Sequence, residues 1–236
     1  MQKYFLNPYI GAKYKEGING KRVLVLGASF YCSLDGNKGR KKCKYYEDCA
    51  INQNSIKYNE KCPYNNGRLL SDSAEGEIDE NGAISYTRFY QFMRWVRSIL
   101  TTESFDEFWE KVAFTNYVQH MIGGRTTTSP SDLREEYFEM FVSLLDELEK
   151  GNKLPDIVIV WGCVIDKPLK THTIPGHPDC RIEIDDEQKG YIFKWKNFNE
   201  KDILFINIYH PSSGQFYTDA EWDNMYPYFK DIFNLD

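Results

Sequence analysis

The sequence predicts an α/β domain in which helices cover both faces of a central parallel sheet. The first observation is a set of four apolar runs, each ended abruptly by polar or turn residues, at 21–27, 112–116, 155–162 and 203–208. Runs of Val, Ile and Leu without alternation are typical of strands buried on both faces, and therefore of parallel sheets. The second observation is that segments with helical periodicity separate these runs. Their order predicts a three-layer α/β/α fold with a central four-stranded parallel sheet.

Hydrophobic residues recur at helical spacing in four segments. These segments cover residues 86–100, 104–111, 129–151 and 218 onward. Ser104 and Glu107 form a capping-box pattern, which is typical of a helix start. Pro130 just inside the third helix and Gly151 just past its end are typical of helix boundaries. Pro227 is expected to break or kink the last helix because it removes a backbone donor.

The remaining segments predict one more strand and two long loops. Residues 191–195 are expected to form an extra edge strand paired with the fourth apolar run. Residues 32–83 and 166–190 do not fit the alternating pattern, and loops of this length in a compact domain are usually functional or tied by a metal. The chain is therefore expected to be a single domain over residues 1–236, with residues 32–83 as an insert.

Length and charge narrow the class of protein. The chain has 236 residues, which suits one large α/β domain, and a formal net charge of −6. That charge argues against broad, non-specific binding to polyanions. The first residues contain no hydrophobic signal-peptide segment, and the longest apolar stretch, 157–165, is too short to span a bilayer. We therefore expect a cytoplasmic monomer that does not enter a membrane.

Polar and aromatic side chains follow each of the four predicted strands. Parallel strands bring their carboxyl ends to one edge, which is where open α/β sheets bind ligands. Ser29, Asn116, Trp161 and His210 stand at these ends. His210 precedes Pro211, which must end the strand, and an imidazole there can exchange a proton near neutral pH. The set contains no carboxylate, which favours recognition of a planar polar ring over carboxylate-driven hydrolysis.

Four short segments at these strand ends carry a resemblance. They are Gly27-Ala-Ser-Phe-Tyr31, Phe114-Thr-Asn116, Ile159-Val-Trp-Gly162 and His210-Pro-Ser-Ser213. In this order they resemble the signature segments of the uracil-DNA glycosylase superfamily, and the chain looks most like divergent bacterial members with a cysteine-containing insert after the first segment. The resemblance implies a uracil-DNA glycosylase-like fold. It also implies a DNA-repair enzyme that hydrolyses the glycosidic bond of a flipped uracil-like or damaged base, in single-stranded or damaged DNA.

The resemblance also implies roles for individual residues. His210 would stabilise the departing base, and Asn116 would read the edge of that base. Tyr31 would limit the size of the pocket, and Gly27 would allow close backbone approach. Ser29 falls where the best-studied members have the aspartate that positions the attacking water. The loss of such a charged group typically costs on the order of 10²–10³ in rate.

Three further residues are assigned to substrate binding. Trp161 and Ser212 lie inside the matching segments. Phe216, beside Tyr217, is a candidate wedge, because apolar side chains often fill the gap that a flipped base leaves in the stack.

The insert holds four cysteines within 31 residues. They are Cys32, Cys43, Cys49 and Cys62. In a reducing compartment such a cluster is more often a metal site or a set of free thiols than a set of disulfides. Four thiolates suit zinc or an iron–sulfur cluster, although the spacing is not that of paired CxxC ligands. The predicted reaction itself requires no cofactor.

Other interpretations remain open. Ser29 and His210-Pro211 also look like the nucleophile and base of Gly-Asp-Ser esterases, but Ala28 and Asn207 replace the two aspartates of that pattern. An Asp-to-Asn change in such a triad costs about 10⁴ in kcat. A homologue that binds nucleic acid or nucleotides without cutting is the third alternative. His172, His177 and Cys180 could be metal ligands, or they could belong to an ordinary polar loop.

Overall fold

The computed structural model describes residues 8–32, 105–118, 121–123, 128–185, 191–208 and 219–233. The predictions for His210, Ser212, Phe216, Cys43, Cys49 and Cys62 lie outside these ranges, as does the helix expected at 86–100. Tyr31 and Cys32 are described in their backbone only.

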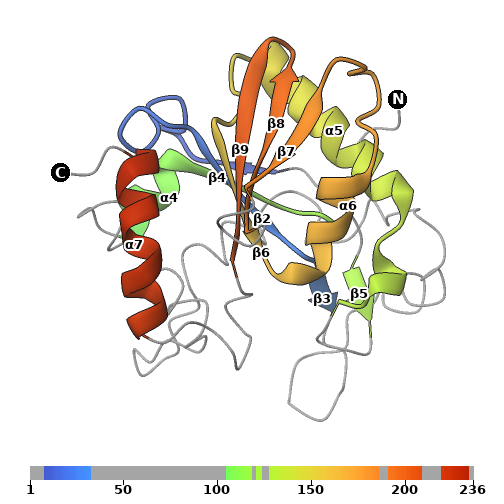
Figure 1. The fold of residues 1–236 in the computed structure, drawn as a ribbon, viewed down its shortest axis with the longest axis horizontal. Helices are drawn as coiled ribbons and strands as arrows, with labels where there is room; N and C mark the ends of the chain where they lie inside the picture. Colours follow the sequence, from blue (N-terminus) through green and yellow to red (C-terminus); the bar gives the residue numbers. More distant parts are fainter. Residues whose placement is uncertain are drawn as a thin grey trace.

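The described elements form an α/β fold around a seven-stranded mixed sheet (Figure 1). Its strand order is β1-β4-β2-β6-β9-β8-β7. The bounds are β1 Tyr9–Ile10, β2 Val23–Gly27, β4 Val112–Asn116, β6 Ile157–Trp161, β7 Arg181–Ile184, β8 Ile192–Phe198 and β9 Lys201–Ile208. The four predicted strands, β4-β2-β6-β9, are neighbours and run parallel. The prediction that the central sheet is four-stranded and parallel is wrong for the sheet as a whole, because β1, β8 and β7 extend the parallel block with antiparallel pairs and make the sheet mixed.

Helices cover both faces of the sheet. They are α4 Phe105–Lys111, α5 Glu135–Lys150, α6 Asp166–Thr171 and α7 Asp219–Phe233. α4 and α7 pack on one face, where Phe108 and Phe229 join a core cluster with Val25 and Ile159. α5 and α6 pack on the other face, on a cluster that includes Leu26. Figure 1 shows the two pairs on opposite sides of the sheet, as the three-layer prediction requires.

Two helix boundaries differ from the sequence prediction. Pro130 begins a short 3₁₀ turn, Pro130–Asp132, and α5 starts only at Glu135, although Gly151 is its C-cap as expected. α7 continues through Pro227 to Phe233 and is not broken. Pro227 itself is exposed.

The segment 166–190, predicted as a loop, contains α6 and β7. α6 has only six residues, and β7 is a mostly exposed edge strand with the sequence Arg-Ile-Glu-Ile. β8 therefore pairs with β9 as expected but is not the edge of the sheet. The buried indole of Trp195 on β8 donates to the carbonyl of Leu169 on α6 at 2.9 Å, which fixes this helix against the sheet.

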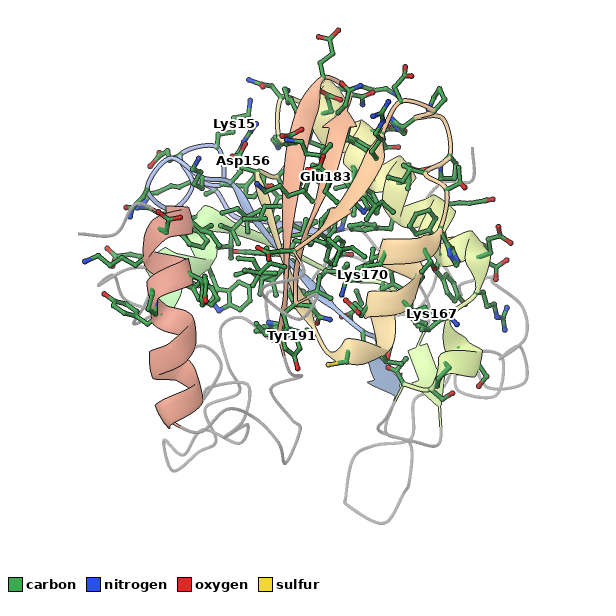
Figure 2. The ribbon with its side chains drawn as sticks, viewed as in Figure 1. Lys15, Asp156, Lys167, Lys170, Glu183 and Tyr191 are labelled. Atoms are coloured by element: carbon green, nitrogen blue, oxygen red, sulfur yellow. The ribbon has the colours of Figure 1, made fainter. Side chains whose placement is uncertain are left out.

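An ion pair joins β2 and β6 at their amino ends, opposite the candidate site. Arg22 donates from Nε and Nη2 to the two carboxylate oxygens of Asp156 at 3.0 and 2.8 Å. Its backbone N–H also donates to Asp156, at 2.8 Å. Burial alone would raise the pKa of Asp156, but the hydrogen bonds and charge of Arg22 outweigh it and hold this pKa below its usual value. Figure 2 shows Asp156 near this end of the sheet.

Asp156→Asn is expected to lower the free energy of unfolding at pH 7 by about 1–2 kcal/mol, since the pair is charged and bidentate but the Asp156 side chain is 34% exposed. A carboxyl with a depressed folded-state pKa stabilises above its unfolded pKa and loses this effect as the pH falls through the folded value. The difference from wild type should therefore shrink below about pH 4. Urea titrations across this range measure it. Glu149→Gln, which removes the more exposed pair with Lys201 at 3.2 Å, is the control and should change little.

Candidate functional site

The carboxyl ends of the four parallel strands form one row of residues. Gly27 is the register partner of Asn116, and Trp161 is the partner of Ile208. Leu26 pairs with Val160, so Gly27 and Trp161 stand at the same level on adjacent strands. Since side chains alternate along a strand, this row shares the α4/α7 face with Val25 and Ile159. The structure thus brings Gly27, Asn116 and Trp161 together.

The row lies where the topology changes direction. The chain passes from β2 to β4 on one side and later to β6 on the other. In open α/β sheets the carboxyl ends of the strands at such a switch point are the usual ligand site. Beyond the row, the chain pairs again in a small parallel sheet of β3 Phe30–Cys32 and β5 Met121–Gly123, seen below the main sheet in Figure 1. The candidate residues therefore stand at the base of two strand extensions.

Gly27 makes room for the side chain of Asn116. A Cβ atom on Gly27 would overlap with Oδ1 of Asn116 and lie 3.2 Å from its Cγ and 3.3 Å from Cζ of Phe114. Asn116 itself is 4% exposed. The space above Gly27 is thus occupied by the side-chain amide of Asn116. The sequence alone does not indicate that this glycine makes room for another residue of the protein.

Aromatic rings lie on the same face of the sheet as Asn116. The ring of Trp161 lies 5.3 Å from that of Phe114, tilted by 58°. Phe114 in turn meets Trp109 of α4 edge to face at 6.0 Å. Such contacts add to the burial energy of large rings and fix their orientation. The amide therefore stands at the strand end next to a cluster of packed rings.

Gly162 turns the chain away from the sheet directly after Trp161. Its φ of 103° lies in a region that residues with a Cβ rarely adopt. Its N–H donates to the carbonyl of Ile208 at 2.8 Å, which ties the end of β6 to the end of β9. The 3₁₀ turn Cys163–Ile165 and α6 follow. Burial, followed by the charge of Asp166, raises the pKa of the Cys163 thiol, so this cysteine is not an activated nucleophile.

A carboxylate that the sequence analysis did not single out lies on the other face of this edge. Nδ2 of Asn207, a residue 2% exposed on β9, donates to Oδ1 of Asp166 at 2.8 Å. Lys170 approaches the same carboxylate at 2.7 Å, and its ammonium lies over the ring of Phe193 at 5.1 Å. Figure 2 shows Lys170 between α6 and the sheet. The i,i+4 spacing of Asp166 and Lys170 was the available sequence signal.

This network bears on the esterase interpretation. In that reading Asn207 stands where an aspartate would orient the histidine. In the structure the side-chain N–H of Asn207 donates a hydrogen bond to Asp166, and Lys170 forms an ion pair with the same carboxylate. Asn207 therefore ties β9 to α6.

Ser29 meets a residue from a distant part of the chain. The residue is 9% exposed, and its hydroxyl is hydrogen-bonded to the hydroxyl of Thr128, 99 positions further along. Thr128 was not among the residues predicted from the sequence. Tyr31 and Cys32 follow within β3, where Tyr31 is the register partner of Ile122.

The polar residues of the segment after α6 make structural contacts. Nε2 of His177 lies 2.9 Å from Oδ1 of Asp146 on α5, and its ring stacks on Phe198 at 4.0 Å. The ring of His172 meets Phe138 edge to face at 5.0 Å. Burial, and less so the charge of Asp202, raises the pKa of the Cys180 thiol to about 11. Within the described ranges, no three His, Cys, Asp or Glu side chains are grouped as metal ligands would be.

Comparison with protein-family models finds no match for this chain, and neither does comparison with curated proteins. Among the helices of the described ranges, none combines the length and the apolar character needed to cross a bilayer.

Proposed function

We propose that this protein is a DNA glycosylase that hydrolyses the bond between a flipped, uracil-like or damaged base and its sugar. The observation that carries the proposal is the amide of Asn116, seated on Gly27 at a strand-end row that includes Trp161. An amide presents a donor and an acceptor on one plane, which matches the edge of a pyrimidine. A base cannot reach such a strand end from within a duplex, so the nucleotide must leave the stack.

In the proposed reaction the glycosidic C–N bond breaks with its electron pair on the base. His210 would donate a hydrogen bond to the base as this charge develops, and Asn116 would hold its edge. The oxygen of a water molecule then bonds to the sugar carbon, and the water's proton passes through solvent to the base. The sugar has oxocarbenium-like character on the way, so a nearby anion would lower the barrier. Ser29 supplies no anion, and the proposed enzyme is accordingly slow.

The esterase alternative receives less support, because the amide N–H of Asn207 is committed to Asp166. A homologue that binds altered bases without cutting remains the rival, since it would need Asn116 and Trp161 but no activated water. The two functions differ in product. Only a glycosylase leaves an abasic site.

The test is an abasic-site cleavage assay on oligonucleotides that each carry one deaminated base. Wild type is expected to release at least one base slowly, Ser29→Asp to release it faster, and His210→Ala to release it more slowly than wild type. Fluorescence anisotropy on the same oligonucleotides measures binding. No abasic product from any variant on any base would overturn the proposal, and selective binding in that case would identify the non-catalytic homologue.

A further inference from the structure

Two hydroxyl groups meet where the resemblance would place a carboxylate. Ser29 lies two residues after the end of β2 and is 9% exposed, and its Oγ is hydrogen-bonded to Oγ1 of Thr128. The local sequence around Ser29 and around Thr128 does not predict this contact, because 99 positions separate the two residues. At this position the described chain therefore has a pair of hydroxyls instead of a carboxylate.

Thr128 is held in place by the turn that follows it. The backbone N–H of Ser129 donates to Oδ2 of Asp132 at 2.7 Å, and the Ser129 hydroxyl donates to the same oxygen at 2.9 Å. The N–H of Asp132 donates back to the carbonyl of Ser129 at 2.9 Å. This capped turn leads into α5, whose buried face packs on the sheet. The backbone that directly follows Thr128 is therefore fixed by hydrogen bonds and by the packing of α5.

The direction of the hydrogen bond decides what Ser29 can offer. If Ser29 donates to Thr128, both lone pairs of the Ser29 oxygen face away from its own proton, and donation strengthens that oxygen as an acceptor. It can then accept a hydrogen bond from the attacking water and turn the water's lone pair toward the sugar. Without Thr128, the Ser29 proton would itself bind the water's lone pair, which is the wrong orientation for attack.

A neutral hydroxyl is too weak a base to take a proton from water, so it cannot replace the carboxylate fully. It can, however, orient the nucleophile. In an oxocarbenium-like reaction the sugar is already cationic when water attacks, so orientation matters before deprotonation does. The missing function is then electrostatic stabilisation, and the retained function is positioning.

We infer that Thr128 is a positioning residue, which holds the Ser29 hydroxyl in the direction that orients the attacking water. This inference rests on the proposed function. In the step concerned, the C–N bond breaks with its electrons on the base and the water oxygen bonds to the sugar carbon. The departing water proton reaches the base through solvent. Thr128 neither gains nor loses a proton in this step.

The test compares Thr128→Val, which keeps the shape and removes the hydroxyl, with Thr128→Ser, which keeps the hydroxyl. On the base that wild type releases, Thr128→Val is expected to lower kcat about tenfold with KM unchanged, and Thr128→Ser to retain most of kcat. Thr128→Val should have no further effect in a Ser29→Ala background. Thermal unfolding of each variant checks that the fold is kept.

A second readout follows the nucleophile itself. In buffer with added methanol, mass spectrometry of the oligonucleotide separates the hydrolysis product from the methyl glycoside. Loss of water orientation should raise the methanol share in Thr128→Val and Ser29→Ala, which a merely structural defect would not do. Unchanged kcat and product ratio in Thr128→Val, or equal damage in Thr128→Ser, would overturn the inference alone. Absence of base release by wild type would instead overturn the proposed function, and this inference with it.

Discussion

Gly27→Ala is expected to lower the free energy of unfolding by about 1–3 kcal/mol, as overpacking of a well-filled site does. The new Cβ would overlap with Oδ1 of Asn116 and press on the ring of Phe114 at 3.3 Å. Gly27 is paired with Asn116 on β4, its carbonyl accepts from the N–H of Tyr117, and the preceding Leu26 is paired with β6, so its backbone has little room to retreat. The Asn116 side chain must rotate instead, out of a position where it is 4% exposed.

The same substitution should reduce base release by about 10²-fold, because a misplaced positioning group can cost that much. Chemical denaturation and the abasic-site assay measure the two effects separately. A double variant, Gly27→Ala with Asn116→Ala, removes the group that the new methyl would strike. It should recover most of the stability lost in Gly27→Ala and none of the activity.

Gly151→Ala is the matched control. Gly151 has a φ of −81°, and the nearest atom to a new Cβ would be the carbonyl oxygen of Leu148 at 3.5 Å, an ordinary contact. This variant should keep wild-type activity and stability close to wild type. If Gly27→Ala behaved in the same way, the contact between Gly27 and Asn116 would have no functional weight.

The elements that the sequence predicts well are those with a buried pattern of their own. β2, β6 and β9 are continuous apolar runs because both of their faces are covered. β7 was missed because its residues are mostly exposed, and its pairing with β8 is what makes it a strand. α6 was missed because six residues are too few to show a helical period. Local patterns thus predict the parallel block, and tertiary contacts decide the rest.

The candidate site likewise contains residues that the sequence could place and residues that it could not. Asn116 and Trp161 could be placed together from the sequence because parallel strands end at one edge. Thr128 and Asp166 could not, since each reaches its partner across a long stretch of chain, Ser29 in one case and Asn207 in the other. No local periodicity records such a contact. It exists only once α5 and α6 have packed on the sheet.

Asn207→Asp is expected to make the free energy of unfolding depend strongly on pH. The new carboxylate would replace the donor that now lies 2.8 Å from Asp166, at a position 2% exposed. Two carboxylates in contact cannot both ionise without a large cost, although Lys170 offsets part of it. At pH 7.5 the variant should be about 2–4 kcal/mol less stable than wild type.

The sign of the pH dependence follows from the raised pKa of the introduced group. Burial and the charge of Asp166 both favour its protonated form, so its pKa in the folded protein exceeds the value in the unfolded chain. The destabilisation is then absent below the unfolded pKa of about 4 and grows as the pH rises through it. Protonated, the new side chain can still donate to Asp166. Urea midpoints of both proteins between pH 4 and 8 measure this difference.

Two further variants separate repulsion from a lost hydrogen bond. Asn207→Leu removes the donor without adding charge, so its cost should be smaller and flat with pH. Adding Asp166→Asn to Asn207→Asp restores one carboxylate and one amide in exchanged positions, which should recover much of the stability at neutral pH. A pH-independent cost in Asn207→Asp, or no recovery in the exchanged pair, would contradict the network. β9 ends two positions before His210, so under the proposed function the loss of the hydrogen bond between Asn207 and Asp166 should also lower base release. Full activity in a folded Asn207→Leu variant would show that this hydrogen bond serves stability alone.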